Sequence, residues 1–188
     1  MIVPTLIGAA IAVQLCKKYD KFKIFYFSYM FALILGIVRY IAGYENMMVY
    51  VILNALGGFP LGIAAILQYQ FTPDCYEYGQ YKTGLKMRGV TFAAQTFFTK
   101  LNGAIATAAS VFALTLIGFK EGEGVIQAAG FADKLWTFSC LGSIIGGICT
   151  LLILHLYKLN DHDVQLMSKC NNGEITREEA EAQMINRY

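Results

Sequence analysis

Lys100 is the residue whose type and position most strongly indicate chemistry. It lies about ten residues into a long apolar stretch, 90–119, and is the only charged residue in that stretch. In a helix that position is roughly 15 Å from the end, where a cation costs several kcal/mol unless it meets water, a carboxylate or a substrate. Snorkelling to the surface is the structural alternative, but the ammonium group would have to reach too far. We therefore expect Lys100 to be functional.

Polar residues accompany Lys100 along the same predicted helix. Positions i−4, i+3 and i+7 share one helical face, which places Thr96, Gly103 and Thr107 beside Lys100. Hydroxyl and amide groups donate and accept hydrogen bonds without a fixed charge, which suits a polyol ligand. Polar packing between helices is the alternative. With an adjoining stripe included, the candidate substrate-binding residues are Gln95, Thr96, Thr99, Lys100 and Asn102.

Other ionisable residues give weaker signals. Arg39 lies about five residues from the end of its apolar stretch, so both snorkelling and a functional role stay open. His155 and His162 have no nucleophile near them, and no Cys or His group has metal-ligand spacing. We expect no catalytic residues, no bound metal and no enzymatic activity.

The composition indicates a membrane protein. Hydrophobic residues make up 56% of the 188 residues and charged residues 15%, whereas soluble domains carry about 25% charge. We expect an all-α integral membrane fold, because the apolar runs are continuous rather than alternating. The first run is short and lacks the basic start of a signal peptide, so it reads as a helix cut partway or as one that starts late. The expected spans cover about 1–16, 24–43, 47–71, 90–119 and 135–157.

The basic residues predict the orientation. Outside the spans, Lys and Arg number eleven in segments 17–23, 72–89 and 158–188, against two in segments 44–46 and 120–134. The basic segments should face the cytoplasm, which places the C-terminus inside. Residues 158–188 should form a cytoplasmic tail with a short helix, because Thr176 and Glu179 have capping-box spacing.

Glycines mark two further features of the spans. Gly57 to Gly62, with Pro60 between them, should loosen the second long helix, as in transporters with broken helices. Gly142 and Gly146, and likewise Ser143 and Gly147, form small-residue faces that should allow close helix packing.

The segment 73–84 reads Pro-Asp-Cys-Tyr-Glu-Tyr-Gly-Gln-Tyr-Lys-Thr-Gly. It resembles the Asp-x-x-Asp-Tyr-Gly-Glu-x-Lys-Thr-Gly signature of the glycoside–pentoside–hexuronide:cation symporters, which belong to the major facilitator superfamily. Segments 95–101, 15–23 and 156–160 resemble the family's eleventh helix, its basic loop between helices eight and nine, and its ending. Departures include Asp20, Glu77, Gln80 and a charge reversal at Arg88.

The resemblance implies a C-terminal portion, helices eight to twelve, of a plasma-membrane transporter that moves a sugar with Na⁺ or H⁺ by alternating access. No Asp or Glu lies inside any predicted span, so the acidic cation site should lie outside this chain, in a missing N-terminal half. Lys100 would couple the sugar pocket to that half. The implied cytoplasmic gate loop contains Asp74, Glu77, Tyr78, Gly79, Lys82, Thr83 and Gly84.

Two other classes stay open at this point. A non-transporting membrane scaffold or assembly subunit would pack the polar face around Lys100 against a partner. A membrane enzyme would need a clustered catalytic set, which the sequence does not show. The reading frame upstream of Met1 separates these classes, because a transporter predicts about seven more spans with intramembrane Asp residues.

Overall fold

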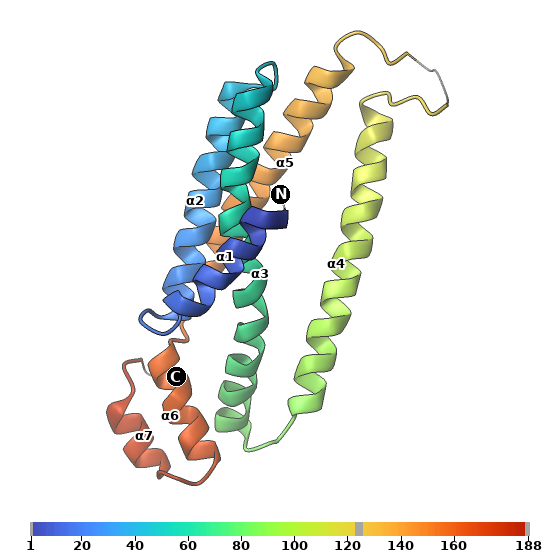
Figure 1. Ribbon diagram of the computed structural model, residues 1–188. Helices are drawn as coiled ribbons and strands as arrows, with labels where there is room; N and C mark the ends of the chain where they lie inside the picture. Colours follow the sequence, from blue (N-terminus) through green and yellow to red (C-terminus); the bar gives the residue numbers. More distant parts are fainter. Residues whose placement is uncertain (1, 123–125, 187–188) are drawn as a thin grey trace.

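The computed structural model describes residues 2–122 and 126–186, and these residues form helices and connections without a strand. The helices shown in Figure 1 are α1 (Ile2–Leu15), α2 (Lys21–Ala42), α3 (Met47–Thr83), α4 (Arg88–Leu116), α5 (Phe131–Leu154), α6 (Asp161–Asn171) and α7 (Arg177–Gln183). Four of them, α2 to α5, are long and apolar enough to cross a membrane. The all-helical prediction is confirmed.

The first predicted span is shorter than a membrane crossing. α1 has 14 residues, or about 21 Å of helix, against a hydrocarbon core of about 30 Å. It is an apolar helix below the length that marks α2 to α5. The fifth crossing therefore stays a prediction.

α3 differs most from its predicted bounds. It was expected to end near Phe71 and give way to a loop, but it continues through Pro73 to Thr83, 37 residues in all. Its length of about 55 Å exceeds the thickness of a hydrocarbon core, so part of it must extend beyond the bilayer. Gly84, with φ +73° in the left-handed region, ends the helix and donates its N–H to the Gln80 carbonyl. The expected gate loop is thus mostly helix.

Gly62 serves helix packing, and the expected loosening of α3 at Gly57 to Gly62 stays a prediction. α3 is helical throughout this region, and α1 crosses it closely. A Cβ atom on Gly62 would lie 2.0 Å from the Thr5 carbonyl oxygen, and one on Gly8 would lie 2.2 Å from the Phe59 carbonyl oxygen. Only glycine allows the two backbones to approach this closely.

One of the two predicted small-residue faces packs as expected. A Cβ atom on Gly147 of α5 would lie 3.3 Å from Leu33 of α2, so the face with Ser143 allows close approach. Gly142 and Gly146 have no atom of the described residues within 4 Å of such a Cβ position. Their packing role stays a prediction.

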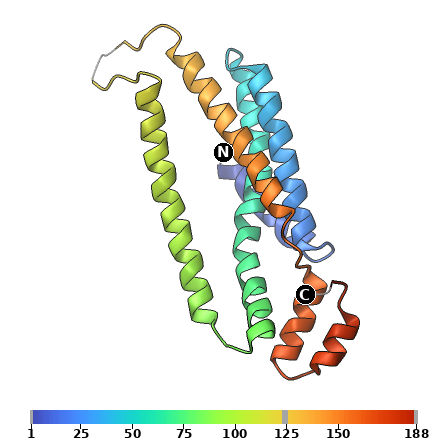
Figure 2. The same cartoon turned by 180° about the vertical axis from the view of Figure 1, so that it is seen from behind.

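α4 lies at one side of the molecule, beyond the group formed by α1, α2, α3 and α5 (Figures 1 and 2). Its main contacts are with α3, to which residues 84–87 connect it. Ala113 is its one residue classed as buried. Most of the surface of α4 is therefore unpacked within the described chain.

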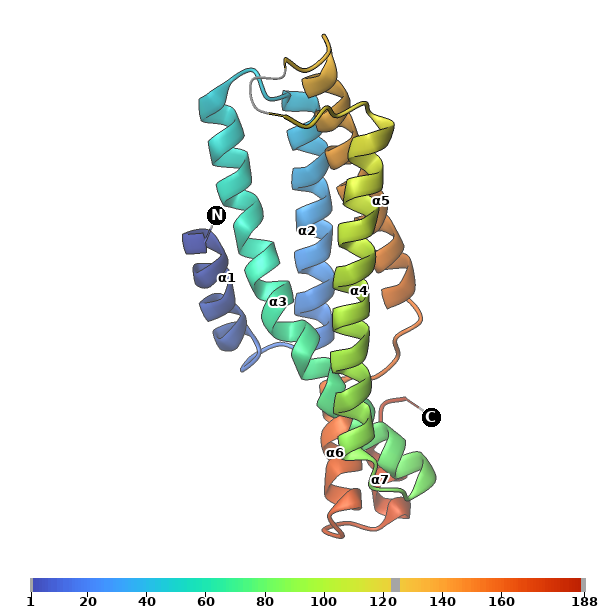
Figure 3. The same cartoon turned by 90° about the vertical axis from the view of Figure 1, so that its right-hand side faces the viewer.

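The tail forms two short helices below the bundle, as Figure 3 shows, and α6 packs on the end of α3. Asn160 caps α6 by accepting a hydrogen bond from the Asp163 N–H at 2.8 Å. The predicted capping box of α7 is confirmed, with both the Thr176 and Glu179 bonds present. The tail helices are thus present, while their cytoplasmic location stays a prediction.

Candidate functional site

The N-termini of α2 and α6 and the last third of α3 bring together four charged residues, here called the Lys21 cluster: Asp20, Lys21, Asp74 and Asp161. The Lys21 ammonium lies 2.8 Å from both oxygens of Asp74 and 3.3 Å from Asp161 Oδ1. Asp74 is buried, and Lys21 retains 19% side-chain exposure. Two carboxylates contact the ammonium group, and Asp20 adds a third carboxylate to the cluster, so the cluster has an excess of negative charge.

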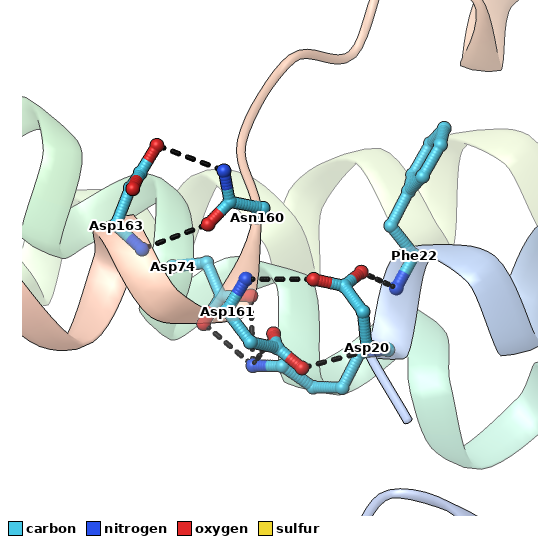
Figure 4. A network of polar contacts seen from close by, with 7 residues as sticks. Asp20, Phe22, Asp74, Asn160, Asp161 and Asp163 are labelled. Carbon is cyan, nitrogen blue, oxygen red and sulfur yellow. Dashed lines mark hydrogen bonds and ion pairs between the residues drawn. The ribbon is translucent and has the colours of Figure 1, made fainter. Parts of the chain in front are cut away.

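The backbone explains why the cluster tolerates this acidity. Asp20 caps α2 by accepting from the Phe22 N–H at 2.9 Å, and its other oxygen accepts from the Asp161 N–H at 3.0 Å (Figure 4). Asp161 in turn accepts from the Lys21 N–H at 2.8 Å. Helix N-termini present free N–H groups and a positive dipole end, which stabilise carboxylates there. Asp20, a departure from the family pattern, thus joins two helix ends.

The rest of the 73–84 segment contacts the tail. The Asn171 side-chain amide donates to the Glu77 carbonyl and to Glu77 Oε2, at 2.9 and 2.8 Å. The Tyr81 hydroxyl donates to Glu181 at 3.0 Å, and the Arg177 guanidinium lies 4.8 Å from the centre of the Tyr81 ring. Sequence patterns did not predict these contacts, because residue spacing cannot pair a helix with a tail that lies about 100 residues away.

Asp163 holds the tail itself together. Its buried carboxylate accepts from the N–H groups of Ile185 and Asn186 at 2.8 and 3.0 Å, and from the Asn160 amide at 2.8 Å. Burial alone would raise the pKa of Asp163, but these hydrogen bonds to its charged form outweigh burial and lower the pKa. Asp163 therefore stays ionised and anchors the end of the chain.

Other residues of the expected gate have local roles. The Thr83 hydroxyl donates to the Gly79 carbonyl at 2.8 Å and accepts from the Leu85 N–H at 3.2 Å, which completes the end of α3 with Gly84. Lys82 is exposed. Tyr78 is partly buried.

The predicted substrate residues lie together on α4, apart from the Lys21 cluster. Thr96, Thr99, Lys100 and Asn102 are exposed, and Gln95 is partly so. The Thr96 and Thr99 hydroxyls donate to the carbonyls of Phe92 and Gln95, at 3.0 and 2.8 Å, so their oxygens remain able to accept. These back-bonds to i−4 carbonyls are common for Thr within helices.

Lys100 lies near the middle of α4, about 18 Å from its first residue. No carboxylate of residues 2–122 and 126–186 forms an ion pair with it. Lys100 is exposed within the described chain, and these helices do not seal it inside a bundle. The face can therefore offer one positive charge and several hydrogen-bonding groups to something outside the described chain.

Four apolar helices long enough to cross a bilayer define a multi-pass membrane protein. Residues 1–161 match the family described as MFS/sugar transport protein, and the chain belongs to that family. The expected glycoside–pentoside–hexuronide symporter relationship is confirmed. The family consists of transporters, which confirms that the chain is not an enzyme.

Relatives give the same picture. The chain is 24% identical over 185 residues to a sulfoquinovose importer of Escherichia coli (strain K12), covering 94% of this chain and 38% of the importer. It is 21% identical over 165 residues to the glycoside/cation symporter YagG of the same strain, and the match covers 88% of this chain and 36% of the symporter. A third relative is a 2,3-dihydroxypropane-1-sulfonate exporter of Salmonella typhimurium (strain LT2). It is 26% identical to this chain over 113 residues, which cover 60% of this chain and 24% of the exporter.

The chain thus spans less than two fifths of the length of these relatives. No solved structure matches it.

Proposed function

We propose that the chain is the C-terminal part of a sugar:cation symporter that works by alternating access. Membership of a sugar-transport family and the name of a glycoside/cation symporter among the relatives support this proposal. In such transporters two helical halves rock around a site near the midplane of the membrane. The observation that carries the proposal is the polar face of α4, where Lys100 has no ion-pair partner in the described chain.

The proposed substrate site is the face with Gln95, Thr96, Thr99, Lys100 and Asn102. Its hydroxyl and amide groups bind sugar hydroxyls, and the Lys100 ammonium links the sugar to carboxylates of the other half. The coupling ion, Na⁺ or H⁺, binds at acidic residues of that half. α4 makes few contacts with the other helices of this chain. This is consistent with a helix that forms one side of a substrate site whose other side belongs to the other half of the transporter.

The proposed gate is the end of α3 from Asp74 to Gly84, on the cytoplasmic side of the plasma membrane. Because Lys21, Asn171 and Arg177 already contact this segment, the α3 end and the tail move as one unit when the halves rock. Charges at such an end can lock the halves in one state and release them in the other.

We propose sulfonated sugars as a second substrate class, in addition to neutral glycosides. Two relatives are named for sulfonated substrates. A sulfonate is a permanent anion, so the Lys100 ammonium would form an ion pair with it in addition to a charge-assisted hydrogen bond, whereas a neutral hydroxyl offers only the hydrogen bond.

The first test is to read the genomic sequence before Met1 and to express whatever continuous transporter it encodes. Ion-driven uptake of a labelled neutral glycoside and of sulfoquinovose is then measured in membrane vesicles. Lys100→Gln should lower coupled uptake at least tenfold, and uptake of the sulfonated sugar more than that of the neutral one. Lys120→Gln, an exposed lysine outside the helices, is the matched control.

Undiminished coupled uptake in Lys100→Gln would remove Lys100 from the mechanism. No uptake at all by a complete, folded protein would favour the scaffold alternative. Equal loss for both sugars would keep the coupling role and remove the preference for a sulfonate.

A further inference from the structure

Two buried donors without an acceptor lie side by side at one end of the bundle. Among the buried side-chain nitrogen and oxygen atoms of the described residues, Arg39 Nε and Trp136 Nε1 have no hydrogen-bond partner. The Arg39 guanidinium carbon lies 5.7 Å from the centre of the Trp136 ring. Buried polar groups are nearly always paired, so two unpaired donors at one place indicate an acceptor that the described chain does not supply.

A cavity lies at these two residues. It has a volume of about 440 Å³, and its lining includes Arg39, Tyr44, Met47, Tyr50 and Trp136. A second cavity of about 210 Å³ also includes Arg39 in its lining. There is therefore space for a ligand group beside the Arg39 and Trp136 side chains, whose unpaired nitrogen atoms are themselves buried.

The Arg39 guanidinium is the charge of this site that has no carboxylate partner in the described part of the chain, while Asp133 and Glu45 lie near Tyr44. No carboxylate of the described residues forms an ion pair with Arg39. Its guanidinium makes one long hydrogen bond, 3.4 Å from Nη1 to the Asn54 side-chain oxygen. The nearby Asp133 carboxylate accepts from the Tyr44 hydroxyl at 2.6 Å. The planar guanidinium fork matches the oxygens of a phosphate group.

The position of the site indicates where such a phosphate comes from. Arg39 lies three residues before the end of α2 at Ala42, or about 4.5 Å of helix. Tyr44, Tyr50 and Trp136 gather around it, with ring centres 5.5 and 5.9 Å from Trp136. Aromatic side chains at helix ends are typical of the level of the lipid headgroups.

We propose that Arg39 and Trp136 bind the phosphate group of a membrane phospholipid, separately from the sugar site on α4. The guanidinium pairs with the phosphate, and a small movement of the Trp136 ring lets its buried N–H donate to one of the phosphate oxygens. The acyl chains lie along apolar side chains nearer the membrane centre, such as Ile34 and Leu61, which are 51% and 53% exposed. A free phosphate ion has the same oxyanion chemistry and is the other possible source.

The chain has one tryptophan, so Trp136 fluorescence reports directly on the site. The chain is purified in an uncharged, phosphate-free detergent and titrated with short-chain phosphatidylglycerol, with diacylglycerol of the same chains, and with inorganic phosphate. We expect a saturable fluorescence change with phosphatidylglycerol and none with diacylglycerol. A saturable response to inorganic phosphate at equal or lower concentration would identify the free ion as the source and overturn the lipid assignment.

Variants test the roles of the two donors. Arg39→Gln should weaken the response to phosphatidylglycerol at least tenfold, Arg39→Lys should weaken it less, and Lys120→Gln should leave it unchanged. Circular dichroism verifies that each variant keeps its helices. For Trp136→Phe, retention of phosphatidylglycerol is measured by native mass spectrometry and should fall.

An equal response to diacylglycerol, or no response to either anionic probe by the helical chain, would overturn the proposal. An unchanged response in a folded Arg39→Gln variant would do the same. If Arg39→Gln fails to fold, the comparison of Arg39→Lys with Lys120→Gln decides, because an unweakened Arg39→Lys would contradict the role of the guanidinium fork.

Discussion

Lys21 and Lys100 are lysines of the same chain in opposite settings. Lys21 contacts two carboxylates and joins the N-termini of α2 and α6 to the last third of α3. Lys100 is exposed on a helix with few contacts, and no carboxylate of the described residues pairs with it. The Lys21 cluster is satisfied within the chain, while the α4 face offers its groups to something else. Removing one partner of a partly buried pair leaves the other charge uncompensated and destabilises the fold, whereas a charge without a partner is available for function.

The comparison predicts its largest stability effect at Asp74. Asp74→Asn leaves the partly buried Lys21 ammonium with Asp161 as its remaining carboxylate partner, so the free energy of unfolding should fall by about 3 kcal/mol. Denaturant titration of the chain in detergent, followed by circular dichroism, measures this change. Glu45→Gln, which removes an exposed carboxylate at the other end of the bundle, should change little.

A double-mutant cycle with Lys21→Gln sharpens this result. If the pair stabilises the fold, the double variant should be less destabilised than the sum of the two single variants. Additive losses would show that Asp74 acts independently of Lys21.

The second prediction compares a glycine packed between two helices, Gly62, with an unpacked glycine, Gly103. Gly62→Ala places a Cβ atom 2.0 Å from the Thr5 carbonyl oxygen and must push α1 away from α3, at a cost of about 1–3 kcal/mol. Gly103→Ala on α4 meets nothing within 4 Å and should be neutral or stabilising by up to about 1 kcal/mol. The same thermal or denaturant measurement serves both variants, and equal effects would contradict the packing of α1 on α3.

The third effect is a pH dependence of the tail. The pKa of Asp163 is lowered in the folded chain, so its contribution is complete above the unfolded value of about 4 and is lost as pH falls through the lower folded value. The protection factors of the α6 and α7 amides, corrected for the intrinsic pH dependence of hydrogen exchange, should therefore fall only in acid. Asp163→Asn should show fast exchange already at neutral pH, with a loss of about 1.5–3 kcal/mol. Tail protection that is the same in wild type and variant would contradict the anchoring role.

The smallest stability effect is expected at Lys100. Lys100→Gln should change the free energy of unfolding by less than about 0.5 kcal/mol, because an exposed side chain without a partner contributes little. The same variant should lose coupled transport, so stability and function separate at this residue. A loss of several kcal/mol would instead show that Lys100 is part of a packed interface.

Local patterns predicted the elements well and their ends less well. Apolar runs located α2 to α5, and cap spacing located α7, because both signals depend on neighbours along the chain. The extension of α3 to Thr83 was not predicted, since polar residues and Pro73 indicated a loop. Glu77 and Tyr81 of this extension have partners in the tail, about 100 residues away, and such partners are invisible to local patterns.

The sequence by itself determined that this chain is a bundle of apolar helices of a transporter family, with a lysine deep in one helix. These features follow from the lengths of the hydrophobic segments and the order of the motifs, which are local properties of the sequence. Only the tertiary structure decided which charges are satisfied. It paired Lys21 with Asp74 and Asp161, left Lys100 without a carboxylate in the described chain, and placed Arg39 against Trp136. Coulomb energy and hydrogen bonding depend on distances in space, and those distances arise only when helices far apart in sequence pack together.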